Sequence, residues 1–325
     1  MLSVLPGPNP LRAGLLLTLL VSLAGCSHLV PYSQVRRTLP ATSFLEFAGQ
    51  DVHVEVAGQG EPVLLIHGFG GSTFSWRQTL PALANDHRVI ALDLFGFGYT
   101  ERPKRLEHYS REGQIELILG VLDRLGVREA HVIGHSYGGG LAMTLAAEHP
   151  ERVRSLVLVD STAPNWAISR RRNLAELSPL TWLFVRGYAL RPAMVRKALE
   201  RSWYDDTQVT DQVVNEYLKR LQIEGAAHAY RGLTVPLGNE GEQRQVFVQD
   251  LTQPTLVIWG ADDALIPAED GKLAASQMQD SRFVEFSDCG HSPMEEHPEA
   301  FVAVVRDFLG QHSSAGSSDP LPARR

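Results

Sequence analysis

The sequence is poor in cysteine and has no excess of positive charge, and both shortages exclude classes of protein. Its 325 residues include only two cysteines, too few for a disulfide framework, and four-ligand zinc spacing is absent. Lysine and arginine number 30 against 37 acidic residues, for a formal net charge of −7. The chain therefore lacks the basic footprint of nucleic-acid binding, and we expect no such partner. A hydrophobic share of 44% is instead typical of a globular protein.

The N-terminal region lacks an apolar run long enough to span a membrane. Residues 13–25 form an apolar run of 13 residues, short of the roughly 18 needed to span a membrane but typical of an export signal. The run ends in Leu23-Ala24-Gly25-Cys26, which resembles the lipobox of bacterial lipoproteins. The resemblance implies cleavage before Cys26 and lipid attachment to its thiol. An ordinary cleavage site or an uncleaved anchor is the alternative.

This N-terminal pattern leads to an expected location. Residues 1–25 should be a signal peptide and residues 26–43 a lipidated tether. The lipid anchor would hold the protein on a membrane of the bacterial cell envelope. Ser27, directly after the lipidated cysteine, favours the outer membrane.

The rest of the chain alternates short apolar runs with longer segments of helical periodicity. Seven runs predict strands, at residues 52–56, 62–66, 88–92, 130–133, 155–159, 255–259 and 283–286. Most are too apolar for a sheet with one solvated face, which favours buried, largely parallel strands. Helices are predicted at residues 76–84, 111–125, 138–148, 267–278 and 298–309. The alternation predicts an α/β fold with a doubly wound, mostly parallel sheet.

One long stretch interrupts this alternation. Residues 165–245 contain no strand-like run, and their apolar residues recur at helical spacing. Loops of that length without structure are rare in compact domains, so we expect a helical cap inserted between two strands. The core should comprise residues 44–164 and 246–310, and residues 311–325 should be a disordered tail.

A Gly-x-Ser-x-Gly motif, Gly134-His135-Ser136-Tyr137-Gly138, follows one of the predicted strands and precedes a predicted helix. This context predicts a nucleophile elbow, a turn that holds the serine hydroxyl at the carboxyl edge of the sheet. The helix that follows directs N–H groups and its positive dipole end towards a developing oxyanion. Ser136 is therefore the candidate nucleophile. A glycine-rich turn without chemistry is the alternative.

A second glycine-rich turn, His67-Gly68-Phe69-Gly70-Gly71, follows an earlier strand. It is not a phosphate-binding loop, because the Gly-Lys-Ser/Thr sequence is missing. An elbow enzyme takes its second oxyanion donor from a loop in this position. We expect the backbone N–H groups of Phe69 and Tyr137 to form an oxyanion hole. We interpret His67 as a structural residue of the loop rather than as a base.

Acids and a histidine follow the late strands, in the order Ser, Asp, His expected of an elbow enzyme. His291 is the candidate general base. Asp262 and Asp263 are adjacent candidates for the acid that orients it. Asp160, at the end of another strand, is a third candidate with a capping or loop role as the alternative. His291 and His297 lack the H-E-x-x-H spacing of a zinc helix, so we expect no metal and no cofactor.

Together these segments resemble the α/β-hydrolase fold superfamily, in particular the branch with a helical cap. That branch includes esterases, lipases, carbon–carbon bond hydrolases and cofactor-free haloperoxidases. The resemblance covers roughly residues 44–309 and rests on residues 67–71, 93–98, 134–139, 260–267 and 290–293. Its register, Gly-x-x-Asp followed by an apolar stretch and Pro, implies Asp263 rather than Asp262 as the acid. Related enzymes that form alkyl-enzyme esters carry Asp where Ser136 stands, so serine favours acyl transfer.

The main hypothesis is therefore a serine hydrolase that cleaves lipidic or other apolar acyl esters through an acyl-enzyme on Ser136. The predicted membrane tether and the aromatic residues of the cap favour an apolar substrate, and Arg170-Arg171-Arg172 offers a contact for anionic headgroups. The alternative is a carbon–carbon bond hydrolase or perhydrolase with the same three residues. A non-catalytic binding lipoprotein is a third hypothesis. Cys289, near His291, is interpreted as a bystander.

Overall fold

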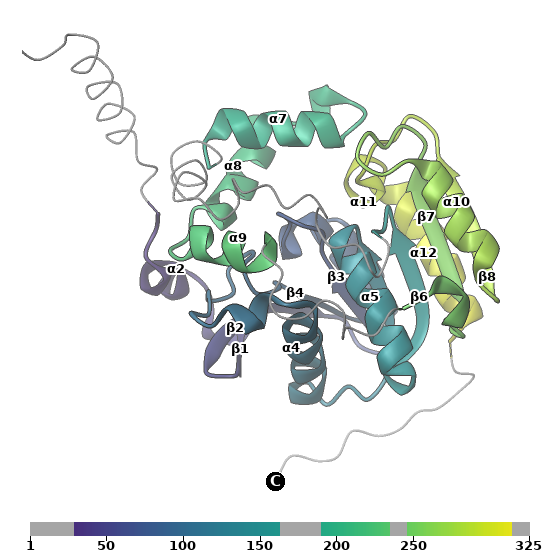
Figure 1. The fold of residues 1–325 in the computed structure, drawn as a ribbon, viewed down its shortest axis with the longest axis horizontal. Coiled ribbons are helices and arrows are strands. Elements are labelled where there is room, and N and C mark those ends of the chain that lie inside the picture. Colours follow the sequence, from purple (N-terminus) through teal and green to yellow (C-terminus); the bar gives the residue numbers. More distant parts are fainter. Residues whose placement is uncertain (1–28, 163–189, 235–245, 314–325) are drawn as a thin grey trace, which may run out of the picture.

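The computed structural model describes residues 29–162, 190–234 and 246–313. Its centre is an eight-stranded sheet in the order β1-β2-β4-β3-β5-β6-β7-β8 (Figure 1). The strands are β1 (Phe44–Phe47), β2 (Gln50–Ala57), β3 (Pro62–Ile66), β4 (Arg88–Leu92), β5 (Ala130–His135), β6 (Val153–Val159), β7 (Thr255–Gly260) and β8 (Ser281–Phe286). From β4 to β8 all neighbours are parallel, and β1 and β2 are joined to the edge as antiparallel strands. The predicted mostly parallel α/β fold is confirmed.

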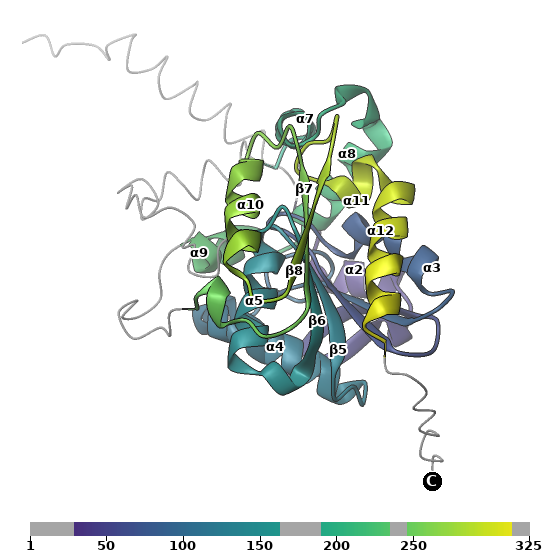
Figure 2. The same cartoon turned by 90° about the vertical axis from the view of Figure 1, so that its right-hand side faces the viewer.

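Helices cover both faces of the sheet (Figure 2). One face carries α4 (Arg111–Arg124), α5 (Tyr137–Glu148) and α10 (Ala268–Gln277), and the other carries α3 (Thr79–Leu83), α11 (Pro293–Glu296) and α12 (Pro298–Gln311). The central strands β3 to β7 are buried on both sides because each face has its own apolar cluster. This explains why the strand sequences are nearly continuously apolar. β1 was not predicted, since its four residues are too few to give a clear alternation.

The insertion between β6 and β7 is helical in its described part. It contains α7 (Pro192–Ser202), α8 (Asp211–Leu221) and α9 (Ala226–Thr234), and α7 and α8 lie above the sheet in Figure 1. Their apolar residues form a third cluster, which includes Val195, Leu199, Trp203 and Val214. Residues 165–189 and 235–245 of the predicted cap lie outside the described residues, and so do the cap aromatics Trp166 and Trp182 and Arg170–Arg172.

The described part of the predicted tether is packed on the protein. Val30 forms a parallel β-bridge with Ile223 of the cap. In α2 (Tyr32–Thr38), Arg36 forms an ion pair with Asp51 of β2, with Nε and Oδ2 2.9 Å apart. Residues 29–38 of the expected tether therefore contact both cap and core.

The predicted signal peptide, Cys26 and most of the predicted tail lie outside the described residues. None of the helices within the three described ranges is long and apolar enough to cross a membrane.

Candidate active site

Ser136 lies in a tight turn between β5 and α5. Its φ of 51° and ψ of −117° place it in the left-handed region, which is strained for a residue with a side chain. The turn is held by the Ser136 N–H, which donates to Val159 O (2.9 Å), and by the Thr162 N–H, which donates to Ser136 O (3.1 Å). A Cβ at Gly138 would lie 2.4 Å from Ile66 O, so only glycine fits there. Strand, strained serine and helix together have the arrangement of a nucleophile elbow.

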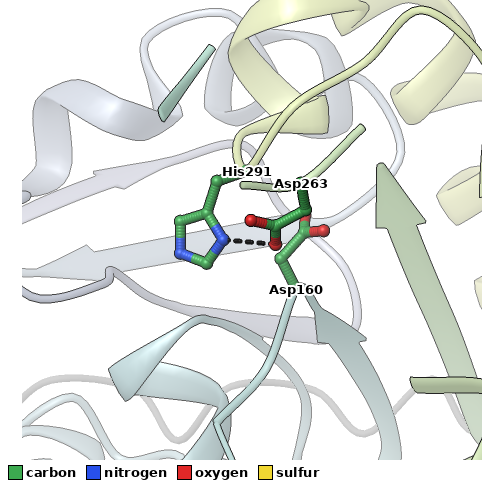
Figure 3. Close-up of side chains that lie close together, drawn as sticks. All are labelled: Asp160, Asp263 and His291. Carbon is green, nitrogen blue, oxygen red and sulfur yellow. Dashed lines mark hydrogen bonds and ion pairs between the residues drawn. The ribbon is translucent and has the colours of Figure 1, made fainter. Parts of the chain in front are cut away.

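The structure brings His291 and Asp263 into direct contact (Figure 3). His291 Nδ1 lies 2.6 Å from Asp263 Oδ2, and both side chains are buried. Asp263 Oδ1 also accepts the N–H groups of Leu265 (2.7 Å) and Ile266 (3.0 Å), which fixes the carboxylate. The neighbouring Asp262 is exposed. Asp263, rather than Asp262, therefore orients the ring of His291.

The loop that carries His291 packs against the elbow through His135. His135 Nε2 lies 2.7 Å from the carbonyl oxygen of His291, and the two ring centroids are 4.9 Å apart. Burial, followed by the nearby His291, holds the pKa of His135 well below its usual value. The neutral ring therefore donates its Nε2–H to His291 O. Within the part of the chain that the structure describes, Ser136 Oγ makes no hydrogen bond to His291; such bonds often tighten only when substrate binds.

The first glycine-rich turn lies beside the elbow. A Cβ on Gly68 would lie 2.7 Å from His135 Nδ1 and 3.0 Å from Ser136 Cβ. The rings of Phe69 and Tyr137, whose N–H groups are the predicted oxyanion donors, are 6.5 Å apart. The two predicted donor residues, one on each of these turns, therefore lie near each other.

His67 holds this turn through both ring nitrogens. Nδ1 lies 2.8 Å from Gly68 O, and Nε2 accepts the Leu94 N–H at 3.1 Å. Burial is the main reason that the pKa of His67 is lowered. A neutral ring with both nitrogens occupied has no lone pair left for a base. This geometry agrees with our structural interpretation of His67.

Asp93 is a buried residue of the same region to which the sequence assigned no role. Its carboxylate accepts the N–H groups of Thr73 (2.6 Å) and Tyr99 (2.7 Å) and lies 2.8 Å from His53 Nδ1. Burial alone would raise its pKa, but its neighbours together, His53 first and the Tyr99 N–H among them, lower the pKa below its usual value. Asp93 therefore fastens the chain just after the oxyanion turn.

Glu296 was also missed, and it holds the loop of the candidate base. This buried carboxylate accepts the N–H groups of Gly290 and Ser292, on either side of His291, each at 3.0 Å. It also accepts the N–H of Tyr204, two residues after the end of α7, at 2.7 Å. Its link to Tyr204 spans 92 residues, so no local signal in the sequence pointed to this contact with the cap.

Glu295 is the other buried acid of α11, and it fastens the cap at a second point. It pairs with Arg77 and accepts a hydrogen bond from the hydroxyl of Tyr217 in α8. Tyr217 OH also lies 3.1 Å from Ser75 Oγ. Burial raises the pKa of Glu295, and the charge of Arg77 opposes that rise.

Asp160, the third candidate acid, lies at the end of β6 next to Asp263. One ligand-type atom each of Asp160, Asp263 and His291 lies within 4.8 Å of the others. His291 Nδ1 already shares its hydrogen with Asp263 at 2.6 Å, so this nitrogen is not available to a metal ion. We therefore interpret the three side chains as a hydrogen-bonding group.

An apolar cavity of about 400 Å³ lies beside these loops, between the sheet, α5 and α10. Its described lining is Met143, Leu158, Ser161, Thr162, Val248, Val257, Trp259, Leu265, Ile266, Pro267, Asp270, Leu273, Ala274 and Gln277. This lining includes one acid and no lysine, arginine or histidine. Such a lining suits an apolar group, but it includes none of Ser136, Asp263 and His291.

The known proteins that this chain resembles in sequence and in structure include several hydrolases. A family model described as alpha/beta hydrolase fold matches residues 61–298. A 2-hydroxymuconate semialdehyde hydrolase of Pseudomonas sp. (strain CF600) is 32% identical over 83% of this chain and 94% of its own length. The structure of a meta-cleavage product hydrolase from Pseudomonas fluorescens IP01 (CumD) aligns with a TM-score of 0.69 and 28% identity, over 83% of this chain and 98% of that one. A thermophilic esterase from Thermogutta terrifontis aligns with a TM-score of 0.64 and 25% identity, over 83% and 98%.

Proposed function

Since the chain belongs to the α/β-hydrolase fold family, we propose that it is a serine-dependent hydrolase of carbon–carbon bonds. The substrate class would be ring-cleavage products related to 2-hydroxymuconate semialdehyde. The observation that carries the proposal is the 32% identity to a hydrolase of that substrate over 94% of its length. The comparisons support the alternative hypothesis from the sequence better than the ester or lipid hydrolase that we ranked first. The carbon–carbon bond hypothesis and the ester hypothesis both describe a hydrolase.

The proposed chemistry needs a nucleophile, a proton carrier and an oxyanion site. Ser136 attacks a carbonyl carbon while His291 accepts its proton, and Asp263 stabilises the imidazolium that forms. Backbone N–H groups of Phe69 and Tyr137 bind the oxyanion. The carbon–carbon bond then breaks as the departing carbon takes a proton from His291. Water, activated by His291, releases the acyl group from Ser136.

The leaving group explains why one set of residues serves two reactions. An ester releases an alkoxide, whereas a carbon–carbon bond breaks only if the departing carbon is stabilised, as it is when it leaves as an enolate. The three residues supply the same proton transfers in both cases. The choice between the reactions therefore depends on the groups that bind the rest of the substrate.

The test is turnover of 2-hydroxymuconate semialdehyde by the purified full-length protein. We expect loss of its visible absorbance, and no loss above background with the Ser136→Ala variant. Equal rates for the two proteins would contradict the proposal. It would also be contradicted if the wild-type protein hydrolysed simple esters while leaving ring-cleavage products intact.

Ester hydrolysis remains the second candidate function because the structure also aligns with that of the thermophilic esterase. A series of p-nitrophenyl esters of increasing acyl length, with phospholipids alongside, tests this candidate. Activity that rises with chain length supports it, and activity confined to ring-cleavage products contradicts it.

We also propose that the mature protein is held in the bacterial cell envelope by lipid on Cys26. The support is the 13-residue apolar run that ends in Leu23-Ala24-Gly25-Cys26. Labelled palmitate should be incorporated into the wild-type protein and not into the Cys26→Ala variant. Labelling that persists in the variant would contradict the proposal.

A further inference from the structure

Two carboxyl groups lie side by side behind the candidate base. Asp160 ends β6 and Asp263 follows β7, and these two strands are neighbours in the sheet. Figure 3 shows the two side chains next to each other, with His291 on Asp263. Both carboxyl groups are buried, and ligand-type atoms of all three residues lie within 4.8 Å of one another. Two negative charges so close in a buried site repel each other strongly, so a single proton is held between them.

The hydrogen bonds of the two acids are unequal. Asp263 accepts three N–H groups, from Leu265, Ile266 and His291. Asp160 accepts one, from the Gly260 N–H to Oδ1 at 2.9 Å, and its Oδ2 is buried without a partner among the described residues. N–H donors stabilise a carboxylate, whereas a buried oxygen without a donor is better satisfied as a hydroxyl. The proton therefore belongs on Asp160.

The surroundings of Asp160 add further negative charge. The titratable groups that face it are Asp263 from the loop after β7, Cys289 and His291 from the loop after β8, and Glu296 from α11. Burial raises the pKa of Asp160 well above its usual value, and the charge of Asp263 raises it further. The hydrogen bonds and the neighbouring charges thus both favour the protonated form of Asp160.

We propose that Asp160 is a positioning residue that carries a proton at neutral pH and donates it in a hydrogen bond to Asp263. This inference rests on the proposed function only in assigning His291 as base and Asp263 as its acid. The bond fixes the second side of the Asp263 carboxylate and lowers its affinity for the hydrogen on His291 Nδ1. His291 then faces one negative charge, and its Nε2 stays available to accept the proton of Ser136.

The backbone of Asp160 supplies a matched variant. Its φ is 41°, a left-handed conformation that asparagine adopts more readily than most residues. Asp160→Asn keeps an acceptor for the Gly260 N–H and a donor for Asp263, so it imitates the neutral acid. Asp160→Ala removes both. Asp262→Asn removes a nearby exposed charge and serves as the control.

The first test is the rate of active-site labelling by a fluorophosphonate, measured against pH. This reaction needs the nucleophile and the base but not the natural substrate, so it separates this inference from the choice of substrate. We expect Asp160→Asn to label within about threefold of the wild-type rate with an unmoved acid limb, and Asp160→Ala to label roughly 10 to 100 times more slowly. If Asp160 were ionised, Asp160→Asn would remove a charge near His291 and move the acid limb down by about a unit or more. That shift would overturn the proposal.

A second measurement does not depend on reactivity. Infrared spectroscopy of the wild-type protein at neutral pH should show the carbonyl stretch of a protonated carboxyl group. The band should be missing in Asp160→Asn and present in Asp262→Asn. A wild-type spectrum without the band, or a band that persists in Asp160→Asn, would overturn the proposal.

Discussion

The backbone N–H of His291 donates a 2.7 Å hydrogen bond to the carbonyl oxygen of Ser202, the last residue of α7. A helix of the cap is thus joined directly to the loop of the candidate base. Glu296 reinforces the link, because it accepts N–H groups on both sides of His291 and the N–H of Tyr204. The cap therefore helps to place the candidate base.

Glu296→Gln tests this link. An amide nitrogen cannot accept a hydrogen bond, so the substitution leaves at least one of the three N–H groups without its acceptor. A hydrogen bond to a charged group contributes about 1.5–3 kcal/mol, and we expect kcat to fall roughly 10 to 100 times. The control is Glu299→Gln, which changes an exposed glutamate of α12. Unchanged kcat in Glu296→Gln would show that the loop is held by other contacts.

Asp263→Asn should be far more damaging than Asp262→Asn. The amide in place of Asp263 favours the wrong tautomer of His291 and cannot stabilise its charged form, so kcat should fall about 10³ to 10⁴ times. Asp262 is exposed and does not contact the ring, so its variant should stay within about threefold of wild type, as for an ordinary surface change. Steady-state kinetics of the two purified variants decide the matter. The reverse ranking would reassign the acid.

The elbow, the acid loop and the histidine loop were predictable because each depends on local signals. A glycine-rich turn between a strand and a helix fixes where Ser136 stands, and parallel strands bring the ends of β7 and β8 together. Glu296 was not predictable, because its partner Tyr204 is 92 residues away. The same holds for the bridge between Val30 and Ile223. Such contacts exist only once the cap is folded onto the core.

The comparisons favour the second-ranked substrate class, and the sequence ranking differed for a related reason. A serine, an aspartate and a histidine in the proposed roles would provide the same chemistry for an ester and for a carbon–carbon bond, so the motifs do not discriminate between them. The predicted lipid anchor and the cap aromatics turned the ranking towards apolar esters. Similarity over nearly the whole length of a carbon–carbon bond hydrolase reverses that ranking.

The strained backbone of Ser136 predicts a difference between two inactive variants. Glycine adopts a φ of 51° without penalty, whereas alanine keeps the strain. Ser136→Gly should therefore be more stable than Ser136→Ala by about 1 kcal/mol in the free energy of unfolding. Denaturant titration measures this difference.

A matched pair of variants in helix α4 should show the opposite order of stability, with the alanine variant more stable than the glycine variant. Glu116 is exposed in the middle of α4, where glycine is about 1 kcal/mol less favourable than alanine. Glu116→Gly should therefore be less stable than Glu116→Ala. If both pairs shifted in the same direction, the elbow would not be strained.

His131 makes the stability of the fold depend on pH. It is buried in β5 with Nδ1 2.7 Å from Ser155 Oγ, and burial lowers its pKa to about 4 although Glu61 lies nearby. In the unfolded chain a histidine has a pKa of about 6.5. Because the folded pKa is the lower one, the stabilisation is complete above about pH 6.5 and is lost as the pH falls towards 4.

The variant that tests this is His131→Asn, which keeps a hydrogen-bonding partner for Ser155 but does not titrate. Wild type should lose about 3 kcal/mol more than the variant in the free energy of unfolding between pH 7 and pH 4. Urea titrations at the two pH values give both numbers. His149→Asn, at a partly exposed histidine, should leave the wild-type pH dependence unchanged. If His131→Asn kept the wild-type pH dependence of the free energy of unfolding, the prediction would be wrong. The acid sensitivity would then come from other buried histidines with lowered pKa values, such as His67, His87 and His135.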